Sequence, residues 1–154
     1  MGLRKSEHIS EIIVHPNNSN IIWAASQGPL WSPGGERGLY KSTDGGENWK
    51  KVLGGGKWTG VTDIHMDPRN PDRIYAATWQ RHRTVAALMG GGPESGLHRS
   101  EDGGETWTEL KSGLPNYAGK IGFTLSPQKP DVLYASIELE KRNGAVYKLS
   151  LIHI

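Results

Sequence analysis

The chain has 154 residues, of which 35% are hydrophobic, and it contains 21 glycines, 9 prolines and 6 tryptophans. Its net charge of +2 comes from 18 basic and 16 acidic residues without long runs of one sign, which argues against a nucleic-acid partner and a basic membrane patch. Cysteine is absent, which excludes disulfides, thiolate catalysis and cysteine-based zinc sites.

The glycines and prolines predict many turns, and many turns in a short chain indicate many short strands. No apolar stretch is long enough to cross a bilayer, so we expect no membrane span. An apolar segment does not follow the basic pair Arg4-Lys5, and we therefore expect no signal peptide in this chain.

The first repeat covers about residues 9–53 and contains four expected strands. The first strand ends before Pro16, because proline fixes φ and cannot donate to a strand ladder. The second, Ile21–Ala25, is apolar throughout, which suits burial on both faces. The third is Gly38–Ser42, and a turn rich in Asp and Gly joins it to the fourth, which begins at Trp49.

The same order recurs over about residues 61–110 and begins again over about 120–148. The segment from Gly96 to Trp107 repeats the segment from Gly38 to Trp49 almost residue by residue. Four short strands per repeat of this length are typical of a propeller blade. We therefore predict an all-β fold, a partial β-propeller with two complete four-stranded blades plus most of a third.

The third repeat departs from the pattern after Lys148. The segment 149–154 has no Asp, no glycine pair and no Trp, although the first two repeats place all three at this point. It resembles a translated adapter sequence, so we expect residues 149–154 to be a non-native tail without function.

A Ser-x-Asp-x-Gly-x-x-Trp motif occurs once in each complete repeat. The Asp side chain accepts backbone N–H groups of the turn that follows it, Gly supplies a positive φ, and Trp buries a large ring. This spacing explains a self-satisfied hairpin better than catalysis or a calcium loop, so we predict structural roles. The motif residues are Ser42, Asp44, Gly46, Trp49, Ser100, Asp102, Gly104 and Trp107.

The motif resembles the Asp-box (BNR) repeat of sialidases, xyloglucan-cleaving glycoside hydrolases and sortilin-type receptors. From about Gly2 to Lys148 the chain is similar to bacterial proteins with a sortilin N-terminal domain or a BNR-repeat glycosyl-hydrolase-like propeller. The resemblance implies a large propeller exported to the periplasm or the extracellular space, whose remaining blades are the partners of this segment. Enzymes and binding receptors share the repeat, so the resemblance leaves the activity open.

Two acidic residues stand at the same distance before the repeat prolines. Glu11 and Asp63 would face each other from neighbouring blades if the first strand of each blade lines the central channel, with His65 on the same side as Asp63. Such a pair is a candidate for acid–base chemistry in glycoside hydrolysis, and the resemblance also implies an Asp in this part of the strand. The alternative is a polar strand end that faces channel water, and the register fits Thr62 as well as Asp63.

Candidate ligand contacts lie in the loops between the second and third strands. Trp31 stands in the first of these loops, and Arg81, His82 and Arg83 stand in the second. Loops carry binding residues more often than strands, and these side chains suit a glycan or a peptide. The alternative is a packing loop between blades. No spacing of the histidines indicates a metal site, and we expect no cofactor.

Two functions follow from these patterns. The first is an exported scaffold that binds protein, peptide or glycan ligands and is non-catalytic as a fragment. The second is part of a secreted glycoside hydrolase that acts on plant or host polysaccharide. We favour the scaffold at this stage, because structure explains the two carboxylates as well as catalysis does.

Overall fold

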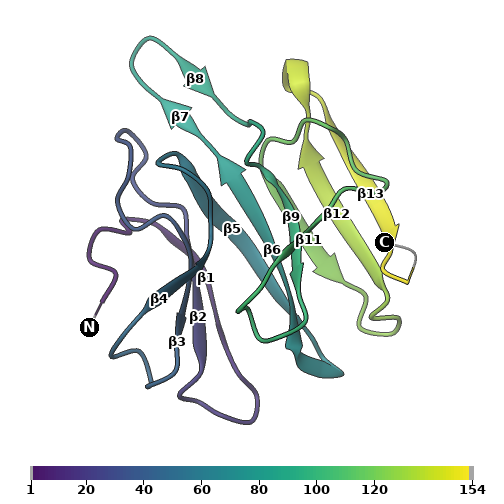
Figure 1. Cartoon of the computed structure of the whole chain (residues 1–154). Coiled ribbons are helices and arrows are strands. Elements are labelled where there is room, and N and C mark those ends of the chain that lie inside the picture. The colour runs from purple at the N-terminus through teal and green to yellow at the C-terminus, as the bar shows by residue number, and fades with distance from the viewer. Residues whose placement is uncertain (1, 153–154) are drawn as a thin grey trace.

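The computed structural model describes residues 2–152, apart from the Arg142 side chain. The described chain is all-β, with three antiparallel sheets side by side and a short hairpin that projects beyond them (Figure 1). Its helical content is one three-residue turn, and within the described residues no helix has the length and apolar character to cross a membrane. The predicted partial propeller, with two four-stranded blades and most of a third, is confirmed.

The first blade consists of four strands that pair in chain order, β1-β2-β3-β4. The turn after Pro16 separates the first two strands, as the missing proline N–H requires. The fourth strand begins one residue after Trp49, the expected start. The strands are β1 (Ile9–Val14), β2 (Ile22–Ser26), β3 (Gly38–Ser42) and β4 (Lys50–Leu53).

The second blade repeats this order and carries an insertion. Its strands pair in the order β5-β6-β9-β10, and the hairpin β7–β8 is inserted between β6 and β9. We expected Arg81, His82 and Arg83 to lie in a loop, whereas β6 continues to Gln80 and a hairpin follows, projecting at the top of Figure 1. The strands are β5 (Thr59–Asp67), β6 (Asn70–Gln80), β7 (His82–Arg83), β8 (Leu88–Met89), β9 (Gly96–Ser100) and β10 (Thr108–Leu110).

The third blade has three strands, β11 (Ile121–Leu125), β12 (Val132–Glu138) and β13 (Gly144–Ser150), with the turn η1 (Glu140–Arg142) before the last. β13 continues two residues past Lys148, where we expected the repeat to end. Leu149 and Leu151 of the expected tail are buried in the core. The last two residues of that tail, His153 and Ile154, lie outside the described residues.

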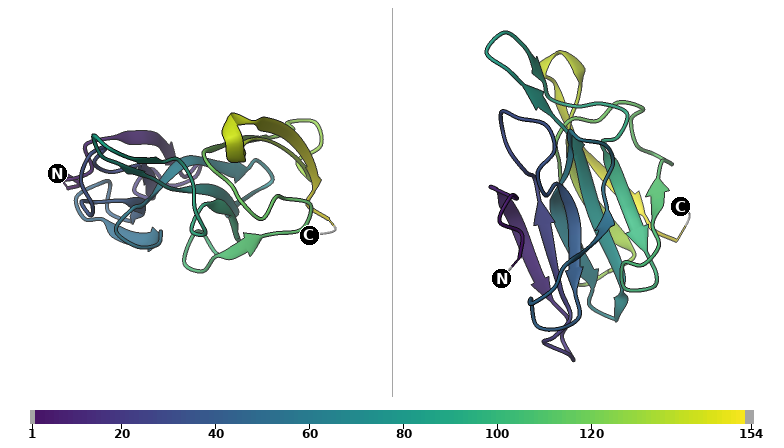
Figure 2. Two further views of the ribbon diagram at one scale, coloured as in Figure 1. Left: turned by 90° about the horizontal axis from the view of Figure 1, so that it is seen from above. Right: turned by 60° about the vertical axis from the view of Figure 1, so that its left-hand side comes forward.

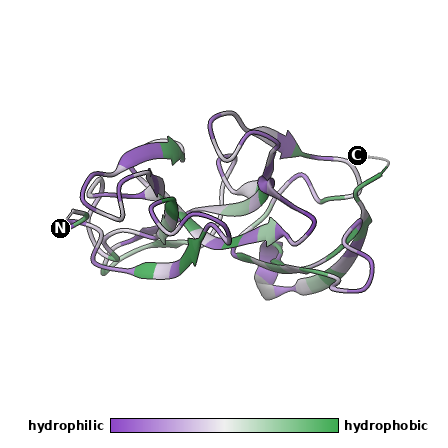
Figure 3. Cartoon of the chain, turned by 90° about the horizontal axis from the view of Figure 1, so that it is seen from below, coloured by the Kyte–Doolittle hydropathy of each residue, from purple (hydrophilic) through white to green (hydrophobic). Residues whose placement is uncertain are grey.

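The blades pack face to face through two hydrophobic cores. One core joins the first and second blades around Trp23, Leu39 and Ile64, and the other joins the second and third blades around Tyr75 and Leu133. The views in Figure 2 show the sheets following one another, and Figure 3 shows hydrophobic segments along strands with hydrophilic residues in many loops. The two hydrophobic cores therefore lie between neighbouring blades.

Both Ser-x-Asp-x-Gly-x-x-Trp turns are closed by their own side chains. Ser42 Oγ donates to Asp44 Oδ1 at 2.7 Å, and Asp44 Oδ1 accepts the backbone N–H of Asn48 at 2.9 Å. The hydrogen bonds that Asn48 and Ser42 donate lower the pKa of Asp44 to about 2. Asp102 makes the equivalent bonds, and these hold its pKa below its usual range as well.

Candidate functional site

The first strands of the first two blades contain the same irregularity. A β-bulge shifts the pairing register between Ile9 and Glu11 in β1 and between Val61 and Asp63 in β5, so the extra residues are Ser10 and Thr62. The bulge establishes that Asp63, and not Thr62, is the equivalent of Glu11.

The two bulge hydroxyls bond across the blade boundaries. The Ser10 hydroxyl donates to the Val61 carbonyl at 3.0 Å, and the Thr62 hydroxyl donates to the Ile121 carbonyl at 3.2 Å. β11 pairs without a bulge, so the third blade has no equivalent hydroxyl. Each bulge thus ties its own first strand to the first strand of the next blade.

Each carboxylate bonds to the backbone of the next blade. Glu11 Oε2 accepts the Ile64 N–H at 3.0 Å, and Asp63 Oδ2 accepts the Phe123 N–H at 2.8 Å. Ile64 and Phe123 occupy equivalent positions in β5 and β11. Gly122 takes the corresponding place in the third blade and has no side chain. These two bonds fix one oxygen of each carboxylate and leave the other oxygen for chemistry.

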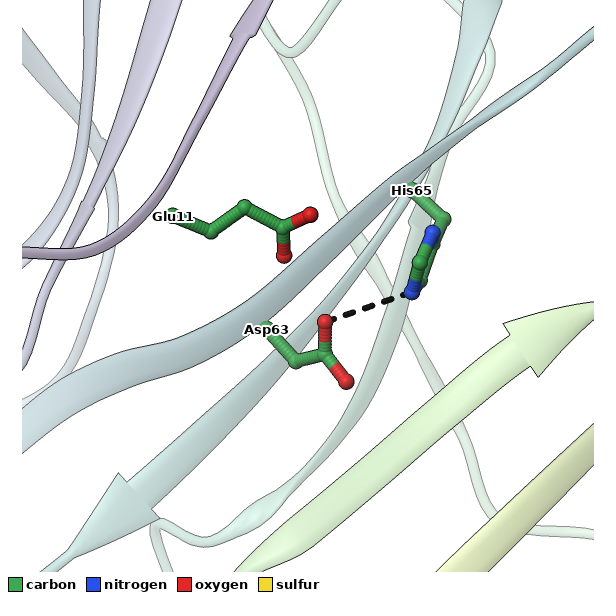
Figure 4. A group of neighbouring side chains, drawn as sticks. All are labelled: Glu11, Asp63 and His65. Atoms are coloured by element: carbon green, nitrogen blue, oxygen red, sulfur yellow. Dashed lines mark ion pairs between the residues drawn. The ribbon is translucent and has the colours of Figure 1, made fainter.

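The second oxygen of Asp63 faces the imidazole of His65, and Glu11 lies beside this pair (Figure 4). Glu11, Asp63 and His65 each offer one atom, and these atoms lie within 4.8 Å of one another. His65 Nε2 is 3.3 Å from Asp63 Oδ1, and its ring packs edge-on against Phe123 with the centroids 4.8 Å apart. Sequence reasoning placed these three side chains on one side of neighbouring strands, and the structure brings them together.

His65 is the one member of this group that the repeat does not require. The equivalent position carries Ile13 in the first blade and Thr124 in the third. The amide contacts of Glu11 and Asp63 recur from blade to blade, whereas the imidazole occurs once. The second blade therefore adds a titratable group to a structural contact.

The environment displaces the pKa values of the two carboxylates in opposite directions. Burial raises the pKa of Glu11, and contact with Asp63 raises it further, while the Ile64 N–H opposes the shift. Burial acts to raise the pKa of Asp63 as well, but hydrogen bonds from His65, Glu11 and the Phe123 amide outweigh it and lower that pKa. Bonding to Asp63 raises the pKa of His65 against the effect of burial.

These opposite displacements make Glu11 the weaker acid of the two and Asp63 the stronger. Carboxyl groups whose environments separate their pKa values are the usual proton donor and acceptor of an acid–base site. One imidazole nitrogen and two carboxylate oxygens are also a ligand set for a divalent cation. The spacing of the histidines gave no such prediction, because the ligands come from two blades.

The predicted ligand-contact residues form a second group at the loop end of the first two blades. The guanidinium of Arg83 lies over the ring of Trp31 at 4.6 Å, and Trp31 is 56% exposed. Arg81 lies over Trp79 at 5.0 Å. The insertion hairpin of the second blade thus reaches the loop of the first, and the predicted residues gather at one place.

Trp58 completes this group and was missed by sequence reasoning. Its ring stacks on His82 with the centroids 3.9 Å apart, and Arg37 lies 5.9 Å from its centre. A tryptophan directly before β5 was the available signal, since that position opens the same end of the second blade. We name Trp31, Trp58, Trp79, Arg81, His82 and Arg83 the aromatic cluster.

Comparison with known proteins identifies the fold. No family model and no curated protein matches the chain. Among solved structures, an ancestral GH74 enzyme matches with a TM-score of 0.67 and 19% identity, covering 93% of this chain and 17% of the enzyme. The GH74 xyloglucanase from Xanthomonas campestris matches with a TM-score of 0.63 and 17% identity, covering 92% and 20%.

These likenesses concern the fold of a segment. The chain spans at most 20% of the length of the matched enzymes. Its three sheets have the same propeller arrangement as the corresponding part of those enzymes. At this identity the comparison supports the fold of a partial propeller and carries no residue roles.

Proposed function

We propose that the chain is a segment of a propeller glycoside hydrolase that acts on a plant polysaccharide of the xyloglucan type. The observation that carries the proposal is the Glu11–Asp63 pair, with opposite pKa displacements, in a fold whose solved likenesses are GH74 enzymes. The matched xyloglucanase suggests the substrate class. This is the function we had ranked second from the sequence, and the comparisons favour it over a scaffold without activity.

In this proposal Glu11 and Asp63 act as one proton-handling unit. Protonated Glu11 gives its proton to the oxygen of the glycosidic bond, and ionised Asp63 holds the acid in place and stabilises positive charge on the sugar. Atoms of the two groups lie within 4.8 Å, closer than the roughly 6.5–9.5 Å between the carboxyl groups that admit a water in inverting enzymes. The opposing carboxylate would come from the remaining blades of the full-length protein.

The aromatic cluster is the proposed contact for the sugar chain. Trp31 is largely exposed, and a flat ring suits the apolar face of a glucose unit. Arg83 beside it offers donors to sugar hydroxyls. The resemblance of the turns to Asp-box (BNR) repeats and to sortilin-like bacterial proteins is part of this proposal. We also propose that the protein is exported to the periplasm or the extracellular space, which agrees with a polysaccharide substrate.

The test compares a neutral ligand with a cationic one. An enzyme site binds an analogue that carries the charge of the transition state more tightly than it binds substrate. We expect an iminosugar-terminated xyloglucan oligosaccharide to bind the chain at least ~10-fold more tightly than the neutral oligosaccharide in calorimetry. Asp63→Asn should remove this advantage and leave neutral binding unchanged.

Trp31→Ala should lower the affinity for both ligands equally. Glu47→Gln, which removes an exposed carboxylate, is the matched control for Asp63→Asn. Equal affinity of the two ligands for the wild-type chain would support the scaffold function. Absence of binding to either ligand would contradict the glycoside hydrolase proposal and leave a scaffold for protein or peptide ligands.

A further inference from the structure

The group formed by Glu11, Asp63 and His65 has the geometry of a metal-binding site. His65 Nε2 lies 3.3 Å from Asp63 Oδ1, and one ligand atom from each of the three residues lies within 4.8 Å of the other two (Figure 4). Two ligand atoms on a tetrahedral zinc ion stand about 3.4 Å apart, since each lies about 2.1 Å from the metal. The His65–Asp63 pair therefore has the spacing of two zinc ligands, and Glu11 supplies a third from the neighbouring blade.

The backbone of the following blade orients each carboxylate for this role. Glu11 Oε2 accepts the Ile64 N–H at 3.0 Å, and Asp63 Oδ2 accepts the Phe123 N–H at 2.8 Å. The Phe123 ring also contacts the imidazole edge-on. Metal-ligating side chains are usually oriented by hydrogen bonds of this kind from outside the ligand set. The ligands are thus held in place by strands of all three blades.

No lysine or arginine pairs with these two carboxylates. Asp63 has only His65 as an ion-pair partner, and Glu11 has none within the described residues. Charges taken out of water are normally paired or coordinate a metal, so a divalent cation would supply the positive charge that is missing here. Every other carboxylate that forms a side-chain ion pair in the described part of the chain faces a lysine or an arginine, namely Asp67, Glu101, Glu105, Glu109 and Asp131.

The site is open to solvent on one side. The side chain of Asp63 is 19% exposed and that of His65 is 32% exposed. This opening gives an ion a path to the three ligands. It also leaves room for the water that completes the coordination of a metal with three protein ligands.

The imidazole determines which kind of metal fits. Calcium and magnesium take oxygen ligands, whereas an imidazole beside carboxylates suits zinc and similar transition-metal ions. The repeat does not require this imidazole, since the equivalent positions carry Ile13 and Thr124. Among the described residues, a set of three such ligands occurs only here.

We propose that Glu11, Asp63 and His65 bind one divalent transition-metal ion of the zinc class. The binding itself is independent of the proposed glycoside hydrolase activity. Its consequence rests on that activity, because a bound cation keeps both carboxylates ionised and Glu11 then has no proton to give to the glycosidic oxygen. Zinc is thus an inhibitor of the proposed reaction and not its cofactor.

Calorimetry of the untagged chain with zinc chloride at neutral pH tests the proposal. The expected result is one zinc ion per chain, with calcium and magnesium binding at least ~100-fold more weakly. His65→Thr, which introduces the residue of the third blade, and Asp63→Asn should each weaken zinc binding at least ~10-fold. His8→Gln, which removes an exposed histidine outside the site, is the matched control and should leave zinc binding unchanged. Circular dichroism checks that the variants fold.

Proton NMR of the imidazole signals is a second measurement that needs no variant. Zinc should shift the signals of His65 before those of the other five histidines, and magnesium should shift none. Absence of zinc binding by the wild-type chain would overturn the proposal, as would a zinc response of other histidines while His65 stays unchanged. Zinc binding that survives both His65→Thr and Asp63→Asn would also overturn it.

The zinc titration and the iminosugar comparison can fail separately, because the zinc titration contains no sugar. Zinc binding without a preference for the iminosugar would support the metal site and contradict the proposed hydrolase. A preference for the iminosugar without zinc binding would support the hydrolase and overturn the metal site.

Discussion

Replacement of Trp23 by alanine should be among the most destabilising single changes in the chain. The side chain is 1% exposed, lies between the first two blades, and donates its indole N–H to the Gly103 carbonyl at 3.2 Å. A buried Trp removes ~150–250 Å² from water, worth roughly 4–6 kcal/mol as an upper estimate. Measured Trp→Ala substitutions in cores cost about 3–5 kcal/mol.

The hydrogen bond adds a separate contribution. Trp23→Phe keeps most of the apolar ring and leaves the Gly103 carbonyl without its donor, which costs about 1–3 kcal/mol. Trp23→Ala should therefore lower the free energy of unfolding by about 4 kcal/mol and Trp23→Phe by about 2 kcal/mol. Urea unfolding followed by circular dichroism measures both values.

Trp31→Ala is the control, because this tryptophan is 56% exposed and away from the cores. We expect a change below about 0.5 kcal/mol for it. If Trp23→Ala costs less than about 1 kcal/mol, or no more than Trp31→Ala, then packing between blades does not hold the fold together and the reasoning is wrong.

Three further predictions concern charged groups. Asp44 should titrate near pH 2 in carboxyl NMR, and Ser42→Ala should raise that value by removing one donor; an ordinary pKa for Asp44 would contradict the bonding of the turn. Because the pKa of His65 is raised in the fold, its contribution to stability is complete below pH 6.5 and is lost as the pH rises through the folded value. His65→Gln should flatten urea stability against pH in that window, and an unchanged slope would contradict the contact with Asp63. Arg69 bonds to the buried Asp67, so Arg69→Met should lower the melting temperature, less so in high salt; a salt-independent loss would indicate packing and not charge.

Local spacing in the sequence was sufficient to predict the blades and their turns. Proline positions end the first strands, and the Ser42–Trp49 motif contains its own hydrogen-bond partners within eight residues. Such features are predictable because their causes are local in the chain. The packing of Leu149 was not predicted, because the sequence shows no motif there and the core that covers it comes from other segments.

The sequence predicted which residues belong to the site, but it did not predict the contacts that these residues make. Equal distance from Pro16 and Pro68 pointed to Glu11 and Asp63, but their backbone donors belong to the following blades. The Thr62 bulge, which decides the register, depends on pairing with β6 and leaves no mark in the residue pattern. Contacts between segments far apart in sequence require the three-dimensional arrangement of the blades.

The central claim is that Glu11 and Asp63 form an interacting pair whose pKa values are displaced in opposite directions. Carbon-13 NMR of the side-chain carboxyls from pH 2 to 9 measures this directly, and interacting groups titrate as a pair. The account predicts that the Glu11 carboxyl titrates above 4.5 and the Asp63 carboxyl below 3.8, and that Asp63→Asn lowers the pKa of Glu11. Titration of both groups at their ordinary values, or a Glu11 pKa that Asp63→Asn does not change, would contradict it.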